Sequence, residues 1–265
     1  NRGSRCCFIN QNEETEMSVI AVIPSYQPDE KLNLVIDGLK KKGFQDIIVI
    51  DDGSSVEHKK PFEEAAEKGC TVLTHVCNKG KGRALKTAFA YITDHYPSAE
   101  GVVTADGDNQ HRPDDIEKCV EMFLHSGKNQ IVLGARNFSL ENVPLRSRIG
   151  NNITSFIFKK LFRMPITDTQ TGLRVIPYGL LPALCELRGE RYEYESNMFF
   201  FARDRRVDLL QVPIETVYLN ENQTSHFNAL TDSASIYFML LKYSLNSLIS
   251  WLLDIGIYTG IIAAL

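Results

Sequence analysis

Two acidic residues two positions apart are the first sign of chemistry in this chain. Asp106 and Asp108 follow an apolar run at 101–105, and Gln110 comes shortly after them. Two carboxylates and an amide oxygen at this spacing can ligate one hard cation, and Mg²⁺ or Mn²⁺ bound to a diphosphate is the natural use of such a site. Because most isolated Asp-x-Asp pairs are solvated turns, the prediction of a metal site depends on which other groups meet there.

Polar residues also end two other apolar runs. Pro24 and Tyr26 stand at the end of the run 18–24, and Asp51 and Asp52 stand at the end of the run 47–51. In open α/β sheets, ligands bind beyond the carboxyl ends of the strands. Three strand ends that carry polar groups therefore predict one shared crevice, which strengthens the interpretation of the Asp-x-Asp pair as a metal site.

A glycine-rich segment follows the third apolar run. It reads Asn-Lys-Gly-Lys-Gly-Arg at 78–83, with Gly80 and Lys81 at its centre, and it opens a predicted helix. Free backbone N–H groups and three cations at a helix start can meet a phosphate. The segment is not a Walker P-loop, because Gly82 and Arg83 stand where Lys and Ser or Thr are required.

The elements that must position these residues alternate along the chain. Patterns rich in β-branched residues predict strands at 18–24, 47–51, 71–76, 101–105, 130–135 and 207–212. Helical patterns lie at 30–42, 56–68, 83–95, 113–125, 147–162 and 195–204, and 167–172 predicts a loop. Strands that alternate with helices predict an α/β fold whose mostly parallel sheet is covered by helices on both faces.

Composition narrows the class of protein. The 29 Lys and Arg against 33 Asp and Glu give a net charge of −4, and 43% of the 265 residues are hydrophobic. These values indicate a globular protein, and they argue against a chain whose main task is to bind nucleic acid. The six cysteines form no Cys-x-x-Cys pair, so neither a zinc site nor a disulfide framework is predicted.

The two ends of the chain differ from its middle. Residues 1–16 are polar, and we interpret them as a leader outside the fold, which is predicted to span 17–230. Segment 231–243 places Ile236, Met239, Leu240 and Tyr243 on one helical face, as a juxtamembrane interfacial helix would. Segment 244–265 is apolar with one charge, Asp254, and predicts the start of a transmembrane region, with a buried core helix as the alternative.

Six segments in order resemble one family. VIPSYQP, VIDDGSS, NKGKGRAL, TADGDNQH, LGARNF and TDTQTGLR are similar to the family 2 glycosyltransferases of GT-A (Rossmann-like) fold, in the branch of the dolichol-phosphate-mannose-synthase-like and polyprenyl-phosphate enzymes. The resemblance covers 19–228. The tail at 243–265 is similar to the start of a GtrA-like membrane domain, over a shorter stretch.

The resemblance implies a role for each matching residue. The nucleotide sugar is expected at Pro24, Tyr26, Asp51, Asp52, Gly80, Lys81 and Asp106, and the metal, Mg²⁺ or Mn²⁺, at Asp106, Asp108 and Gln110. The acceptor phosphate is expected at Arg136, Arg146 and Arg148, whose planar guanidinium groups suit phosphate oxygens. Asp168 is expected to orient the sugar or to act as a base, with Glu193 and Glu195 as further candidates. His226 stands where the family usually has Lys.

The activity that the resemblance implies is inverting transfer of a sugar from a nucleotide sugar to a membrane polyprenyl phosphate. UDP-glucose or UDP-N-acetylglucosamine is the preferred donor, and GDP-mannose stays open. Two alternatives remain: transfer to a glycan hydroxyl with Asp168 as base, and a nucleotide-binding membrane module without turnover. Lys242 and the apolar tail lead us to expect a membrane-anchored protein with its catalytic domain on the cytoplasmic face of a bacterial plasma membrane, with oligomers possible through the membrane region.

Overall fold

A computed structural model describes residues 18–138 and 145–215, together with positions 245, 249–251, 253–255 and 257–259. The strands are β1 (Val19–Ser25), β2 (Ile47–Asp51), β3 (Thr71–Thr74), β4 (Gly101–Thr104), β5 (Ile131–Arg136), β6 (Arg174–Pro177) and β7 (Leu209–Ile214). The helices are α1 (Lys31–Lys41), α2 (Lys60–Glu67), α3 (Lys81–His95), α4 (Pro113–His125), α5 (Leu145–Leu161), α6 (Leu181–Cys185) and α7 (Glu193–Arg205). Short 3₁₀ turns lie at Val56–His58 and Tyr178–Leu180.

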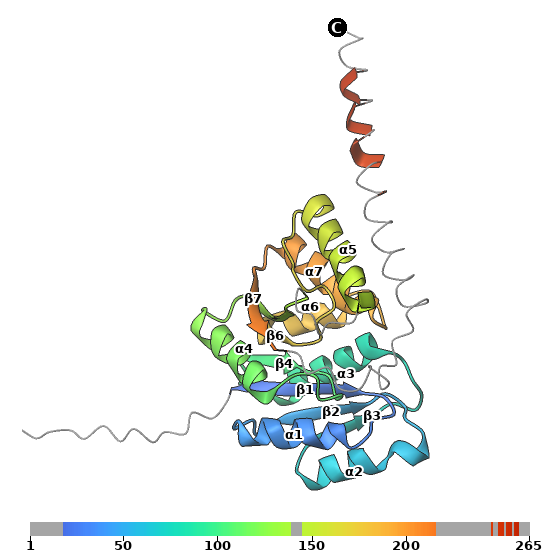
Figure 1. Cartoon of the computed structure of the whole chain (residues 1–265), viewed down its shortest axis with the longest axis vertical. Helices are drawn as coiled ribbons and strands as arrows, with labels where there is room; N and C mark the ends of the chain where they lie inside the picture. The colour runs from blue at the N-terminus through green and yellow to red at the C-terminus, as the bar shows by residue number, and fades with distance from the viewer. Residues whose placement is uncertain are drawn as a thin grey trace, which may run out of the picture.

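The described strands form one sheet in the order β3-β2-β1-β4-β6-β5-β7 (Figure 1). β6 runs antiparallel to both of its neighbours, β4 and β5, and the other pairs are parallel. The predicted α/β fold with a mostly parallel sheet is therefore confirmed. The sequence patterns did not predict β6, because a four-residue run that begins with Arg174 and ends with Pro177 lacks the apolar alternation of a strand.

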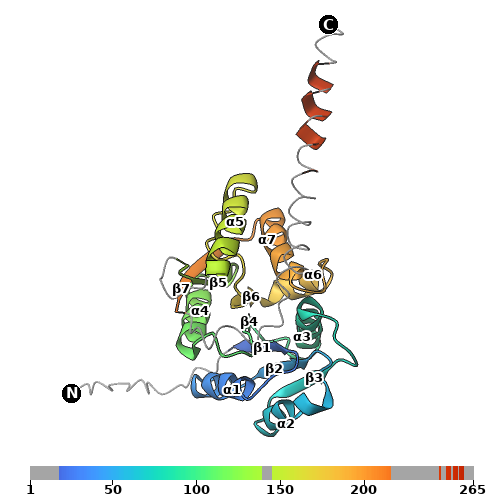
Figure 2. The same cartoon turned by 45° about the vertical axis from the view of Figure 1, so that its right-hand side comes forward.

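The alternating side chains of β1 point into two different parts of the hydrophobic core. Ile20 and Val22 of β1 belong to a cluster that includes side chains of α3, α5, α6 and α7. Ala21 and Ile23 point the other way, into a cluster that includes α1, α2 and α4. Figure 2 shows α1 and α2 on one side of β1 and β2, and α6 and α7 on the other. Helices therefore cover both faces of the sheet, as predicted, and the carboxyl ends of the strands are left accessible to a ligand.

One predicted helix is shorter than its pattern indicated. The pattern at 56–68 predicted one helix, whereas the structure has a 3₁₀ turn at Val56–His58 followed by α2 at Lys60–Glu67. Pro61 lies in the first turn of α2, where its missing N–H needs no partner, so it favours a helix start at that point rather than a helix that runs through it.

Three of the predicted features fall outside the described residues. They are the leader at 1–16, the interfacial helix at 231–243 and, apart from its separate described positions, the transmembrane segment at 244–265. Among the residues that the structure describes, no helix has both the length and the hydropathy to cross a membrane.

Candidate active site

The ends of β1, β2 and β4 and the start of α3 line one cleft of about 650 Å³. Seven of the residues predicted for the nucleotide sugar and the metal line it: Pro24, Tyr26, Asp52, Gly80, Lys81, Asp106 and Asp108. The parallel register places these strand ends at one edge, because β1 pairs with β2 on one side and with β4 on the other. The crevice predicted from the strand ends is therefore present.

Asp106 and Asp108 have different electrostatic surroundings although they are two residues apart. The Lys81 ammonium lies 2.7 Å from Asp106 Oδ1 and 3.0 Å from Glu195 Oε1. Burial alone would raise the pKa of Asp106, but Lys81, together with His111 and Arg136, lowers that pKa to about 2. Burial and the charge of Asp106 raise the pKa of Asp108 to about 6. Asp106 is therefore ionised at neutral pH, whereas Asp108 has a pKa closer to neutrality.

The oxygens of this pair suit a divalent cation. Asp108 Oδ1 accepts a hydrogen bond from the Gln110 backbone N–H at 3.1 Å, and its other oxygen has no hydrogen-bond partner among the described residues. The buried Nδ1 of His111 is also without one there. The described residues contain no cluster of three or more His, Cys, Asp or Glu that could hold a metal. Two carboxylates completed by substrate phosphates are the donor set that Mg²⁺ uses in nucleotide enzymes, so the residues fit such an ion.

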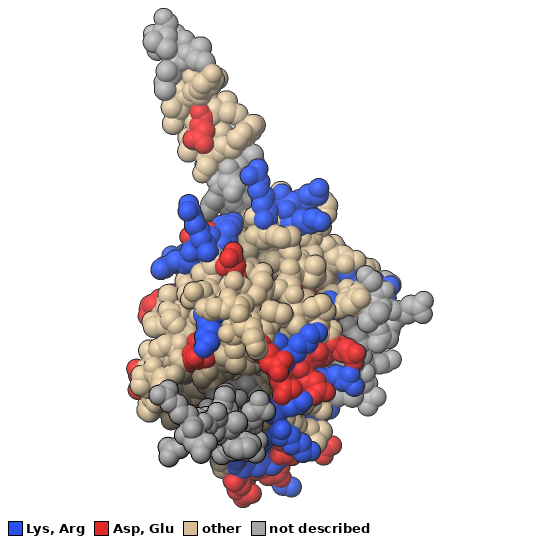
Figure 3. All heavy atoms as spheres, turned by 90° about the vertical axis from the view of Figure 1, so that its left-hand side faces the viewer, with Lys and Arg blue, Asp and Glu red and all other residues tan. Residues whose placement is uncertain are grey.

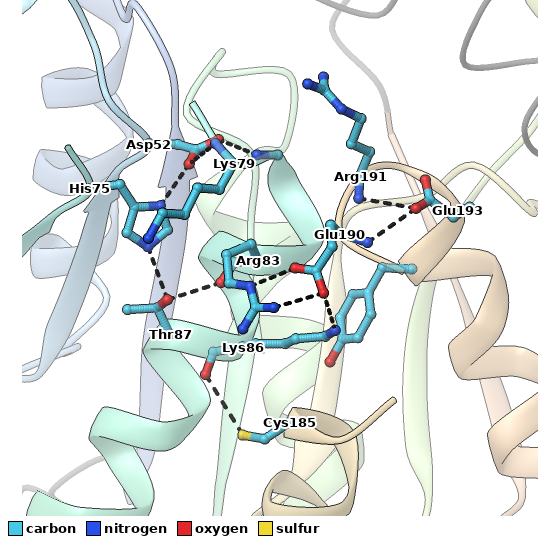
Figure 4. Close-up of polar contacts among 12 residues, drawn as sticks. Asp52, His75, Lys79, Arg83, Lys86, Thr87, Cys185, Glu190, Arg191 and Glu193 are labelled. Carbon is cyan, nitrogen blue, oxygen red and sulfur yellow. Dashed lines mark hydrogen bonds and ion pairs between the residues drawn. The ribbon is translucent and has the colours of Figure 1, made fainter. Parts of the chain in front are cut away.

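The carboxylates of Asp51 and Asp52 form hydrogen bonds and ion pairs with other groups of the protein. Asp51 is buried and does not line the cleft; it accepts the Ser54 N–H at 2.8 Å and pairs with Lys59. Asp52 accepts the backbone N–H groups of Lys79 at 2.9 Å and Gly80 at 2.8 Å. The ring of His75 holds the same carboxylate through Nδ1 at 2.7 Å (Figure 4). These two acids therefore shape the loops around the cleft, and only Asp52 lines it.

A loop far along the sequence closes the other side of the cleft. Glu190 receives Arg83 Nε at 2.5 Å and Lys86 Nζ at 3.0 Å, and its carbonyl accepts the Arg83 N–H at 2.9 Å (Figure 4). A Cβ atom on Gly82 would lie 2.8 Å from the Glu190 carbonyl carbon, so only glycine allows this approach. Arg83 therefore anchors this loop, although the sequence pattern had grouped it with the phosphate-binding cations.

The anchored loop brings a cation to the cleft that sequence reasoning missed. Arg191 and Tyr192 line the cleft. Glu193 accepts the Arg191 backbone N–H at 3.3 Å, while the guanidinium extends away from Glu190 and Glu193 (Figure 4) and has no partner among the described residues. The only sequence signal was the density of charge in the stretch 186–195.

The half-buried Arg136 and the buried Asp168 form an ion pair outside the residues that line the cleft. Arg136 Nε lies 2.7 Å from Asp168 Oδ2, and a second guanidinium nitrogen lies 3.0 Å from Oδ1. The backbone N–H groups of Arg136 and Gln170 donate to the same carboxylate at 3.1 and 3.0 Å. Both oxygens of Asp168 are therefore occupied, and the guanidinium plane of Arg136 is held in one orientation.

The loop that carries Asp168 is joined to the acidic pair. A Cβ atom at Gly172 would collide with Asp106 Oδ2, and Thr104 Oγ1 donates to the Gly172 carbonyl at 2.7 Å. The fully buried Arg174 donates to the carbonyls of Thr171 at 3.2 Å and Glu195 at 2.7 Å. Sequence reasoning missed Arg174. Its one signal was a charge inside a short apolar run, RVIP.

Comparison with known proteins places this geometry in a family. The model of Glycosyl transferase family 2 matches residues 20–181. The chain belongs to this family. A UDP-N-acetylglucosamine–dolichyl-phosphate N-acetylglucosaminyltransferase of Methanococcus voltae is 29% identical over 84% of this chain and 95% of that protein. An uncharacterized protein of Methanocaldococcus jannaschii is 31% identical over 87% of this chain and 94% of that protein.

Solved structures share the fold of this family 2 glycosyltransferase. Glucosyl-3-phosphoglycerate synthase of Mycobacterium tuberculosis, in complex with Mn²⁺, UDP and glucosyl-3-phosphoglycerate, superposes with a TM-score of 0.65 at 18% identity. The match covers 84% of this chain and 78% of that one. At this identity the likeness shows a GT-A-like fold, in agreement with the sheet described above.

The other predicted site residues of the glycosyltransferase are spread more widely. Gln110 follows the acidic pair and Arg148 lies half-buried in the first turns of α5, neither lining the cleft. Glu193 accepts the N–H groups of its own loop, and Glu195 holds Lys81. The Arg146 side chain and His226 lie outside the described residues.

Proposed function

We propose that the protein transfers N-acetylglucosamine from UDP-N-acetylglucosamine to a membrane polyprenyl phosphate, with inversion at the anomeric carbon. The donor and acceptor are those of the related N-acetylglucosaminyltransferase of Methanococcus voltae. UDP-glucose, which is bound in a solved structure of the same fold, is the second donor to test, and GDP-mannose is the third.

The observation that carries the choice of acceptor is the occupied carboxylate of Asp168. A sugar hydroxyl is barely ionised at neutral pH and needs a base, but Asp168 accepts hydrogen bonds at both oxygens from Arg136. A phosphate monoester has a second pKa near 6, so it is mostly dianionic at pH 7 and attacks without a strong base. The geometry thus favours a phosphate acceptor, which Arg136 would bind, over the glycan alternative.

The two halves of the site divide the work. On the donor side, a divalent cation held by Asp106 and Asp108, with Gln110 nearby, would neutralise charge on the departing diphosphate. Mn²⁺ accompanies UDP in a solved structure of the same fold, which supports such an ion. On the acceptor side, Asp168 fixes the guanidinium plane of Arg136, and Arg146 and Arg148 would add charge from α5.

Arg191 is expected to bind the diphosphate from the opposite wall of the cleft. Lys81 is already paired with Asp106 and Glu195, and Arg83 is paired with Glu190. Arg191 lines the cleft, and its guanidinium extends away from Glu190 and Glu193, the acids of its own loop (Figure 4). A permanently charged planar group in that position suits two phosphate groups.

Label transfer tests the proposal. Detergent-solubilised protein, Mn²⁺ and polyprenyl phosphate are mixed with a panel of labelled nucleotide sugars, and label that enters the organic phase is counted. We expect label from UDP-N-acetylglucosamine, lost in Asp108→Ala and retained in Asp94→Ala, which removes an exposed carboxylate of α3. Label that enters a glycan instead would favour the hydroxyl acceptor, and nucleotide binding without any product would favour the non-catalytic module.

Attachment to a membrane, with the catalytic domain on its cytoplasmic face, is part of the proposal. It is supported by the apolar composition of 244–265 and by Lys242 before it. Protease protection of a tag placed before residue 18, in sealed membrane vesicles of known orientation, tests the side on which the domain lies.

A further inference from the structure

Helix α5 exposes an apolar stripe to solvent and buries two polar side chains on its inward side. Its inward face carries Asn151 and Thr154, both buried, beside Phe158. Its outward face carries Ile149, Ile153 and Phe156, which are 50%, 46% and 63% exposed. A surface helix normally buries its apolar stripe and exposes its polar one, so an outward apolar stripe indicates a partner that is itself apolar.

The two buried polar side chains of α5 hold the loop around Asp168. Asn151 donates to the Thr167 carbonyl at 2.7 Å and accepts the Thr169 N–H at 3.1 Å, on either side of Asp168. Thr154 adds a hydrogen bond to the Thr169 hydroxyl at 2.6 Å. The inward face of α5 therefore positions the loop that holds Arg136, whereas nothing in the described part of the chain accounts for the outward stripe.

The stripe continues into positive charge. Ile149, Ile153 and Phe156 are followed along the same face by Lys160, at spacings of four, three and four residues, and Arg163 lies just beyond the end of α5. Arg163 shares a surface hollow with Arg203 and Arg206 from the end of α7. Figure 3 shows Lys and Arg side chains gathered at the top of the main body, below the C-terminal segment, on the end toward which α5 extends in Figure 1.

We propose that the outward face of α5, with the adjoining cations Lys160, Arg163, Arg203 and Arg206, docks onto an anionic lipid surface. An apolar stripe lined by cations that lies along the headgroup boundary is the pattern of an interfacial helix. The Lys and Arg side chains can reach the headgroups while their stems stay in apolar surroundings. A water-soluble protein partner would explain the stripe, but the adjoining cluster of cations favours anionic headgroups.

This surface would also serve the proposed reaction, and the choice of a lipid rests on that proposed function. A polyprenyl phosphate presents its phosphate at the membrane surface. With the outward face of α5 on the membrane and the inward face on the loop of Asp168 and Arg136, about one helix diameter, roughly 10 Å, separates the lipid from the acceptor site. The two faces of a single helix would then align the acceptor with the site.

Fluorescence of an introduced tryptophan tests the docking without any substrate. Trp251 is the only tryptophan of the chain, so Phe156→Trp is made in a Trp251→Phe background, with Leu34→Trp, an exposed site on α1, as the matched control. On vesicles of phosphatidylcholine with phosphatidylglycerol we expect a blue shift of the Phe156→Trp emission and its quenching by brominated acyl chains. Leu34→Trp should show neither.

Three results would overturn the proposal. One is an unshifted Phe156→Trp emission in protein that sediments with the vesicles. A blue shift without vesicles that grows with protein concentration would assign the face to a second copy of the chain. A shift without vesicles that does not depend on concentration would assign it to another segment of the chain itself.

Vesicle binding by charge variants and sugar transfer by variants of the apolar stripe test the docking in two further ways. Lys160→Gln with Arg163→Gln should weaken binding to the anionic vesicles by about fivefold per cation removed, whereas Lys40→Gln with Lys41→Gln on α1 should not.

Ile153→Asp with Phe156→Asp should lower transfer to vesicle-embedded polyprenyl phosphate but not to a water-soluble short-chain analogue. If neither acceptor is used while the tryptophan still enters the bilayer, the proposed acceptor is wrong and the docking stands. Equal transfer by variant and wild type to both acceptors would refute the docking.

Discussion

Two acidic strand ends of similar appearance do different work in this protein. Asp51 and Asp52 at the end of β2 accept backbone N–H groups and pair with Lys59 and His75, so their charge is used to build loops. Asp106 and Asp108 at the end of β4 face the cleft with few partners, one of which is Lys81. The comparison teaches that a carboxylate committed to the backbone is structural, and that one left with open oxygens is available to a ligand.

The largest expected difference between the two strand ends is in catalysis. Asp106→Asn should lower kcat/KM by about 10³-fold, because charge neutralisation on the diphosphate by a bound cation is worth several kcal/mol, about 4 here. Its melting temperature should also fall, because the lowered pKa of Asp106 means that its charge, paired with Lys81, stabilises the fold at neutral pH, so activity is compared at a temperature where both proteins are folded. Activity is measured with label transfer and folding with thermal unfolding, and an active Asp106→Asn would remove the distinction between the pairs.

The second difference is in stability and concerns the other strand end. Asp52→Asn replaces an oxygen that accepts the Gly80 N–H or the Lys79 N–H by a donor, and it weakens the contact with His75. Hydrogen bonds to a buried charged group are worth about 1.5–3 kcal/mol each, so we expect a loss of about 3 kcal/mol in the free energy of unfolding. Denaturant titration measures it. An unchanged midpoint would show that Asp52 does not hold the loop.

The third prediction concerns the pH dependence of stability without metal. The pKa of Asp108 is raised to about 6 in the fold, so the folded state binds its proton more tightly than the unfolded state does, and stability falls as pH rises from about 4 through 6. Asp108→Asn removes the buried charge. It should therefore raise the free energy of unfolding at pH 7 in EDTA by about 1–2 kcal/mol.

The same variant should match the wild type at about pH 3, below the ordinary carboxyl pKa, where Asp108 is mostly protonated in both states. Thermal unfolding of the two proteins at about pH 3 and pH 7 measures the difference. A variant that is less stable than the wild type at both values would mean that Asp108, like Asp52, is held by the protein.

The smallest expected effect concerns Arg191, the cation that we expect to bind the diphosphate across the cleft from Asp106 and Asp108. Arg191→Gln should raise the KM for the nucleotide sugar about tenfold, which is about 1.4 kcal/mol, with little change in kcat. Arg188→Gln removes the same charge from the same loop at a position that does not line the cleft, so it is the matched control. Equal KM values for the two variants would show that Arg191 does not reach the diphosphate.

Much of the fold was predictable because its signals are local. The apolar run and following acids of 47–52 and 101–108 marked two strands and their ends, and parallel pairing required those ends to share an edge. The elements that escaped prediction have signals that depend on distant partners. β6 is a strand only because β4 and β5 flank it, and Arg174 is tolerated there because Thr171 and Glu195 supply carbonyls.

The amino-acid sequence by itself determined the order of the elements, the acidic strand ends and the resemblance to family 2, because residue type and short-range period carry that information. Only the tertiary structure decided which acids are free to bind a ligand, that Asp168 is committed to Arg136, and that Arg191 reaches the cleft. The reason is physical. Whether a charged side chain is available depends on the donors and acceptors around it, and here these come from residues up to about a hundred positions away, as with Arg83 and Glu190.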